Sequence, residues 1–307
     1  MANTKEIKNR IKSVHDTQKI TNAMYLIAST KMQKAKKELE MTKPYFNELR
    51  TEVKRIFRKA NHVNSIYFYP ETDVIDYEGT YGILVITADK GLAGAYNQNV
   101  LKEVNRLVQA HDDVKLFVVG EYGRHYFESH GAPIEESFHF TAQNPTLERA
   151  REISGILLEK YLRKEIVKLF VVFTDFANGF SGGDAKSMRL LPFHRDEFST
   201  EHHEIGEDGY DPHFEFDPSV EDILNFTMPS MLTGFVYSAL VDSFCCEQNA
   251  RMTAMDAANQ NAQNLLDELQ LQYNYVRQGA ITQEITEISS GAKGLAQKRK
   301  KNEGGKL

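Results

Sequence analysis

The chain of 307 residues contains no tryptophan and only two cysteines, Cys245 and Cys246. Neighbouring side chains on a helix point about 100° apart, so we expect neither a disulfide between these cysteines nor a shared metal. So little cysteine is typical of a protein from a reduced compartment such as the cytosol. The first residues lack the apolar core of a secretory signal, and no run of about 18 apolar residues predicts a membrane span.

Charge is distributed unevenly along the chain, and one sign is scarce in several long segments. Residues 1–60 hold 15 Lys and Arg against 6 Asp and Glu, whereas residues 194–222 hold 11 acids against one Arg. The last residues, 295–307, are basic again. Such blocks are typical of solvated faces or of surfaces that meet a partner.

The N-terminal segment has a repeat of 3.5 residues that begins at Ile7 and ends at Leu39. This repeat predicts a coiled-coil helix over residues 1–59. Two of its seam positions, Gln18 and Thr21, are polar, and two are alanine. Pro44 is expected either to end this helix or to kink it.

The C-terminal segment, residues 218–295, is almost free of the residues that break helices. Between Phe235 and Gln278 there is neither glycine nor proline, and small or apolar residues recur at helical spacing. If residues 219–295 form one helix, it is about 115 Å long. Two helices that each have one narrow apolar stripe are expected to pair as an antiparallel coiled coil. A basic tail, residues 296–307, follows.

Residues 78–217 have a different pattern. The β-branched runs YGILVIT, VKLFVVG and KLFVVFTDF alternate with helical patterns at 98–110, 121–130 and 146–163. This alternation predicts a Rossmann-like α/β domain with a mostly parallel sheet, to which SMRLLPF adds a further strand. An acidic, histidine-rich insert at about 194–217 is expected to be a surface loop, because its spacing matches no metal motif.

The turn TADKGLAGAYN, residues 87–97, lies where a nucleotide-binding loop would lie, between a strand and a helix. Its glycines give only GxxG, and neither GxGxxG nor a Lys-Ser/Thr pair is present. We therefore expect a structural turn and no bound cofactor.

Three separated stretches resemble the gamma subunit of F-type ATP synthases. They are IKNRIKSVHDTQKITNAMYLIASTKMQKAK, the turn TADKGLAGAYN, and residues 247–292, which end in the family motif ITxExxExxxGA. The resemblance implies a non-catalytic rotor that couples ion flow through a membrane ring to ATP synthesis or hydrolysis in the catalytic head. It also implies a peripheral position on the cytoplasmic face of a bacterial cell membrane, with alpha, beta, epsilon and the c-ring as partners.

The resemblance further implies two sets of contact residues. The set expected at the alpha and beta subunits is Met24, Arg251, Arg277, Gln278, Thr282, Glu284 and Glu287. The set expected on the side of the ring and the epsilon subunit is Phe214 and Glu215. No catalytic or metal-binding residue is implied.

Two other classes of function stay open at this point. The chain could be a nucleotide-binding α/β enzyme with helical dimerisation arms, which predicts saturable cofactor binding. It could also be a coiled-coil scaffold whose basic N-terminal helix binds nucleic acid, which predicts salt-sensitive retention on DNA.

Overall fold

The computed structural model describes residues 4–59, 65–68, 79–176, 185–193, 217 and 219–303. The chain divides into two compact units, one made of Met1–Leu26 with Met255–Leu307 and the other of Ile27–Ala254. The two terminal helices, α1 (Thr4–Lys59) and α6 (Val220–Glu303), each contribute to both units.

Proline interrupts neither terminal helix. Helix α1 continues through Pro44 to Lys59, and α6 continues through Pro229. Of the two outcomes expected at Pro44, an end of the helix is excluded, and the helix reaches Lys59 as its predicted bounds require. A proline inside a helix costs about 3 kcal/mol, and the buried side chains that follow it, Val53 and Ile56, offset this cost by packing in the core.

In the first unit, α1 and α6 meet along the predicted seam. Ile7 is buried, and the positions that follow at spacings of three and four are half-buried. The Thr21 hydroxyl donates a hydrogen bond to Asn259 Oδ1, and Gln18 Nε2 donates to Gln263 Oε1 at 3.3 Å. Hydrogen-bonded polar pairs thus replace the large apolar pairs of a more stable coiled coil.

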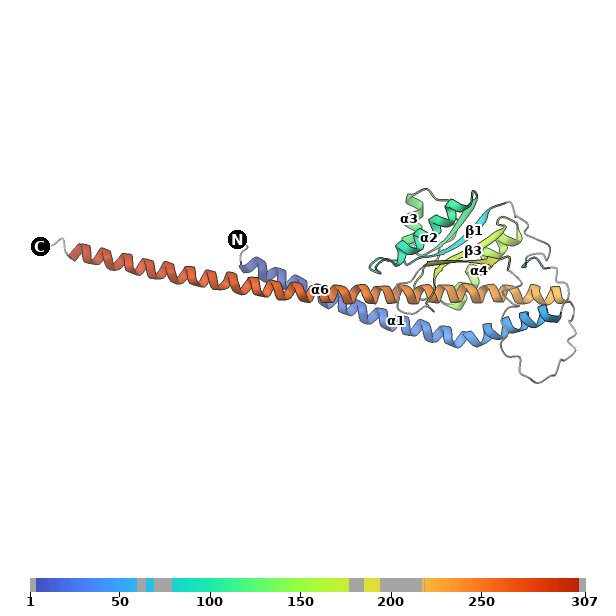
Figure 1. Cartoon of the computed structure of the whole chain (residues 1–307), viewed down its shortest axis with the longest axis horizontal. Coiled ribbons are helices and arrows are strands. Elements are labelled where there is room, and N and C mark those ends of the chain that lie inside the picture. The colour runs from blue at the N-terminus through green and yellow to red at the C-terminus, as the bar shows by residue number, and fades with distance from the viewer. Residues whose placement is uncertain are drawn as a thin grey trace. The chain divides into compact units, whose positions relative to one another are not determined.

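The second unit contains a four-stranded sheet in the order β2-β1-β3-β4; its strands β1 and β3 are labelled in Figure 1. The strands are β1 (Tyr81–Ile86), β2 (Val114–Val119), β3 (Lys168–Thr174) and β4 (Ala185–Leu191). The first three are parallel, and β4 is antiparallel to β3, which confirms the mostly parallel sheet and the added strand.

Helices cover both faces of this sheet. One face packs against α2 (Tyr96–Ala110) and α3 (Glu121–Ser129), and the other packs against α4 (Leu147–Leu162) and parts of α1 and α6 (Figure 1). The chain leaves the central strand β1 for β2 by α2, and it reaches β3 by a crossover that includes α4 on the opposite face. The sheet is therefore doubly wound, and β1 and β3 border the point where the direction of winding changes.

Candidate functional site: the loop after β1 and its contact with α6

The loop between β1 and α2 is folded by its own polar side chains and by two residues with positive φ. Leu92 has φ 63° and Gly94 has φ 55°, so the chain turns sharply. Asn97 Oδ1 accepts a hydrogen bond from the Ala88 N–H at 3.0 Å and fixes the start of the loop against α2. The predicted tight turn is present.

The Asp89 carboxylate lies at the N-terminus of α3, a position that could otherwise bind an anion. Its Oδ1 accepts hydrogen bonds from the N–H groups of Glu121, at the start of α3, at 3.2 Å and of Ala142 at 3.0 Å. Its Oδ2 accepts a hydrogen bond from the Thr141 hydroxyl. A side-chain carboxylate thus provides the negative charge that a helix N-terminus favours.

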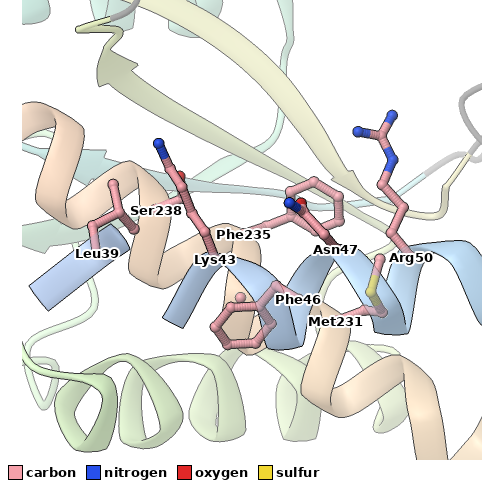
Figure 2. A pocket seen from close by; sticks show the side chains of 9 residues that line it. Leu39, Lys43, Phe46, Asn47, Arg50, Met231, Phe235 and Ser238 are labelled. Carbon is pink, nitrogen blue, oxygen red and sulfur yellow. The ribbon is translucent and has the colours of Figure 1, made fainter. Parts of the chain in front are cut away.

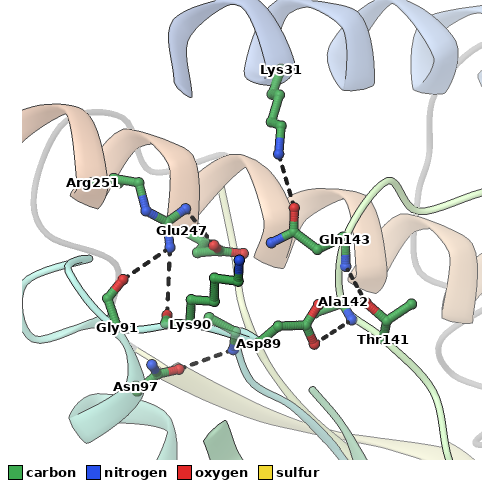
Figure 3. Close-up of polar contacts among 11 residues, drawn as sticks. Lys31, Asp89, Lys90, Gly91, Asn97, Thr141, Ala142, Gln143, Glu247 and Arg251 are labelled. Atoms are coloured by element: carbon green, nitrogen blue, oxygen red, sulfur yellow. Dashed lines mark hydrogen bonds and ion pairs between the residues drawn. The ribbon is translucent and has the colours of Figure 1, made fainter. Parts of the chain in front are cut away.

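Arg251 of α6 binds the middle of the loop, directly after Asp89 (Figure 3). Its Nη2 donates to the carbonyl oxygens of Lys90 at 3.5 Å and Gly91 at 3.2 Å, and its Nη1 pairs with Glu247 Oε1 at 2.5 Å. The loop therefore presents carbonyl oxygens to a cation, whereas a phosphate-binding loop presents N–H groups to an anion.

The carboxyl end of β3 is also occupied by α6. Ser243 Oγ accepts a hydrogen bond from the Thr174 N–H at 3.2 Å, and Cys246 Sγ lies 3.6 Å from the Thr174 carbonyl oxygen. In a doubly wound sheet, ligands bind outside the carboxyl ends of the strands at the point where the winding changes. Here α6 fills that position, and the geometry gives no support to the nucleotide-binding alternative.

Several ionisable groups at this contact are buried. Burial, and secondarily the neighbouring Glu247, raises the pKa of the Tyr96 hydroxyl. Burial also raises the pKa of Glu247, which is 1% exposed, although Arg251 acts in the opposite direction. The pKa of the Cys246 thiol is raised to about 12, chiefly by burial, so this thiol is unreactive near neutral pH.

The contact is therefore a joint between a loop and a helix. Glycine allows the strands to approach closely here: a Cβ at Gly120 would lie 2.4 Å from the Thr87 carbonyl oxygen, and φ at Gly120 is 95°. On the α1 side, Lys31 Nζ donates to Gln143 Oε1 at 2.9 Å (Figure 3). Within the described part of the chain, no group of three His, Cys, Asp or Glu side chains could hold a metal ion.

The residues expected to contact partners fall into three places. Met24 is half-buried on α1, and Arg251 is buried in the joint. Phe214 and Glu215 lie outside the described residues. The remaining five are exposed on successive turns of α6: Arg277, Gln278, Thr282, Glu284 and Glu287.

Sequence analysis missed Asp89, Tyr96 and Glu247 as parts of the joint. One signal for Glu247 was present, because Glu and Arg four residues apart on a helix pair readily, as Glu247 and Arg251 do. Nothing in the sequence indicated that the same arginine reaches the loop.

None of the described helices combines the length and the apolar character that a membrane-spanning helix needs.

Comparison with known proteins gives consistent matches over nearly the whole chain. A family model described as "ATP synthase" matches residues 3–295. The chain is 37% identical to the ATP synthase gamma chain of Acetivibrio thermocellus over 297 residues, which cover 96% of this chain and 100% of that protein. It is 34% identical to the sodium ion specific ATP synthase gamma chain of Acetobacterium woodii over 304 residues, which cover 95% and 99%.

Solved structures with the same fold include a chain of the mitochondrial ATP synthase of Euglena gracilis, OSCP/F1/c-ring, in rotational state 3. The TM-score is 0.62 at 16% identity, with 95% of this chain and 94% of that chain covered. A chain of the central stalk and c-ring structure from Tetrahymena thermophila has a TM-score of 0.52 at 23% identity, with 78% and 99% covered.

Proposed function

This chain belongs to the ATP synthase gamma family, whose members form the central stalk, and from that premise we propose how it works as a rotor. In this proposal α1 and α6 form the shaft, and the C-terminal part of α6 turns inside the head formed by the alpha and beta subunits. The chain transmits torque, and the chemistry of ATP takes place in its partners.

One observation carries the proposal: α6 has a long segment whose side chains are all exposed. Every residue from 277 to 295 is exposed, including Ile281 at 44%, Ile285 at 61% and Ile288 at 69%. Apolar side chains at this spacing form a stripe that water does not favour. Polar side chains cover the rest of the segment, so a surrounding partner would meet hydrogen-bonding groups on every other side. We name this segment, residues 277–295, the exposed tip.

The composition of the tip suits a bearing better than a fixed interface. Fixed interfaces are dominated by a few buried anchors, often Trp, Tyr or Arg. The tip combines isoleucines with Thr, Gln and Glu side chains, and it has neither tryptophan nor tyrosine and only one arginine, Arg277. Many weak contacts of similar strength allow rotation past the partner without one deep energy minimum.

The same proposal assigns the contact residues. Arg277, Gln278, Thr282, Glu284 and Glu287 would meet the alpha and beta subunits from the tip, and Met24 and Arg251 would lie close to the same partners. For Arg251 the guanidinium is already bound to loop carbonyls, so its contribution would be to hold the loop in place. Phe214 and Glu215 are proposed for the side of the c-ring and the epsilon subunit. The complex would hold the chain peripherally at the cytoplasmic face of the membrane.

Deletion of the tip tests this assignment. A chain that lacks residues 277–307 is expected to lose stable assembly with the alpha and beta subunits or ATP-driven turnover of the assembled head. A chain that lacks only residues 296–307 is the matched control and is expected to keep both. Unchanged assembly and turnover after the longer deletion would contradict the assignment of the tip.

A further inference from the structure

Helix α6 has α1 as a neighbour in each of the two units, but its exposed tip has no neighbour among the described residues. In the unit that spans Ile27–Ala254 the two helices pack so closely that a Cβ at Gly234 would collide with the ring of Phe46 (Figure 2). In the other unit, Leu269 is buried on α6. From residue 277 to residue 295, every side chain is exposed.

The apolar stripe of the tip does not continue the seam that faces α1. On α6 that seam follows buried or half-buried positions at alternating spacings of three and four, which are 259, 262, 266, 269, 273 and 276. The same spacing leads next to 280, 283, 287 and 290, which are Ala, Gln, Glu and Ser. The apolar positions of the tip lie one or two residues further along, and each residue turns the helix by about 100°. The stripe of the tip therefore points in a different direction and suits a partner other than α1.

The helix of the tip also needs support from a partner. It contains Gly279, Gly291 and Gly294, and glycine is the least favourable helix residue after proline. A helical segment in water gains most of its stability from packing of its apolar face. The helix nevertheless continues to Glu303.

The spacing of the stripe is that of a coiled coil. Its apolar positions alternate intervals of four and three residues, so two of them take position a of a heptad and three take position d. The residues at a are Ile285 and Ala292, and those at d are Ile281, Ile288 and Leu295. A second copy of the chain offers a stripe of the same length and the same period.

Two charges in the tip select the orientation of such a pair. Arg277 and Glu284 both take position g, and within the described part of the chain neither side chain forms a hydrogen bond or an ion pair. In an antiparallel pair in which Ile281 faces Ile285 of the second copy, Arg277 of each chain lies beside Glu284 of the other. In a parallel pair the same two residues would face Thr282 and Ser289, which carry no charge.

From this pattern we propose that the exposed tips of two unassembled chains pair as an antiparallel coiled coil. The isoleucines form its central layers, and two ion pairs between Arg277 and Glu284 border them. The proposal rests on the exposure and the pattern of the tip in the isolated chain. One consequence rests on the proposed function as well: the alpha and beta subunits would have to displace the second copy when the head assembles.

Sedimentation equilibrium of the full chain, without other subunits, tests the pairing at concentrations up to about 100 µM. We expect an equilibrium between monomer and dimer. Ile285→Glu places a charge in the central layers and is expected to weaken the dimer at least about tenfold. Thr286→Glu adds the same charge beside the stripe and is the matched control, which should dimerise as the unmodified chain does. Thermal unfolding establishes that each variant is folded.

Exchange of the two charges tests the partners. Arg277→Glu and Glu284→Arg, each alone, are expected to weaken the dimer about threefold or more, because like charges then meet twice in each pair. The two substitutions together are expected to restore it. Lys293→Glu makes the same change of charge away from the stripe and should have no such effect.

Introduced cysteines test the orientation. Both native cysteines are buried, so mild oxidation acts on the introduced thiols. A mixture of the Ile281→Cys and Ile285→Cys chains is expected to form a disulfide between the two variants, because only residues that face each other closely can be bridged. Each variant alone should form little.

Three results would overturn the proposal. They are a chain that stays monomeric throughout the concentration range, a dimer that Ile285→Glu leaves unchanged, and disulfides that form within each cysteine variant alone, as parallel pairing requires. These measurements contain no alpha or beta subunit. Their failure would therefore leave the role proposed for the tip in the head untouched, and the deletion described above tests that role separately.

Discussion

At the scale of single residues, the most informative feature is the buried pair of Glu247 and Arg251. A buried carboxylate is unfavourable unless a cation and hydrogen bonds compensate for its lost hydration. Arg251 provides that compensation through Nη1. Its Nη2 donates hydrogen bonds to the carbonyl oxygens of Lys90 and Gly91. The pair therefore stabilises the loop, and each member depends on the other.

We predict that removing Arg251 alone lowers the free energy of unfolding more than removing the charges of both Arg251 and Glu247. Arg251→Met leaves Glu247 charged and buried, and it is expected to lower the free energy of unfolding by about 3 kcal/mol. Glu247→Gln combined with Arg251→Met is expected to cost less, because no buried charge remains. Urea unfolding of the full chain measures both. A double variant that is no more stable than the single one would show that the ion pair is not the cause.

Asp242 gives the chain a distinct dependence on pH. Burial, followed by the nearby Asp175, raises its pKa to about 6 from an ordinary value of 3.8. The folded state therefore favours the protonated form. This contribution to stability is fully present below pH 3.8 and is lost as the pH rises through 6.

The variant Asp242→Asn should remove this dependence, because its amide cannot ionise. At pH 7 we expect the variant to be more stable than the unmodified chain by about 2 kcal/mol, at 1.4 kcal/mol per pKa unit with a reduction for residual solvent contact. At pH 3.5 the two should be nearly equal. Asp112→Asn, at an exposed aspartate, is the control. Equal stabilities of Asp242→Asn and the unmodified chain at both pH values would contradict the prediction.

At the scale of secondary-structure elements, periodicity was sufficient to predict the long helices, the three parallel strands and the helices between them. Each of these elements buries one face, and burial imposes a period on the sequence. At Pro44 the pattern left open whether the helix ended or was kinked, although residues 1–59 were expected to form one helix. The local rule disfavours proline within a helix, but the packing of Val53 and Ile56 decides the outcome, and that packing involves residues far away in the sequence.

The loop after β1 shows where prediction from sequence ended. The spacing of its glycines indicated a turn and argued against phosphate binding, which agrees with the geometry. The partner of the loop, Arg251, is about 160 residues away. The sequence does not show that α6 packs at the carboxyl end of β3. No local pattern could therefore identify the contact between Arg251 and the loop. The contact roles proposed for the tip rest on family resemblance and stay predictions.

The polar pairs in the seam between α1 and α6 are expected to lower the stability of the two-helix unit. We expect that the seam is suited to function and not to maximal stability. Thr21→Val combined with Asn259→Leu replaces a hydrogen-bonded pair by an apolar one and should stabilise the two-helix unit by about 1 kcal/mol. Thermal unfolding measures this gain. Thr21→Val alone, which leaves Asn259 without its donor, is the comparison and should not stabilise the chain. A loss of stability in the double variant would show that the polar pair is itself the better seam contact.

At the scale of the whole molecule, the family and the exposed tip point to a part that works only within a larger assembly. Residues 277–295 are exposed in the isolated chain, and their isoleucines need a surrounding surface. At the carboxyl ends of β1 and β3, where doubly wound sheets bind ligands, α6 occupies the position. As a member of the ATP synthase gamma family, the chain is expected to act as one part of that complex.

Direct observation of rotation tests the central claim. Both native cysteines are buried and have pKa values of about 12, so a thiol introduced by Lys102→Cys on the exposed face of α2 can be labelled selectively with a bead. With the alpha and beta subunits fixed to a surface, we predict that ATP drives rotation of the bead in one direction. ATP hydrolysis at the full rate while the labelled chain stays at a fixed angle would contradict the account.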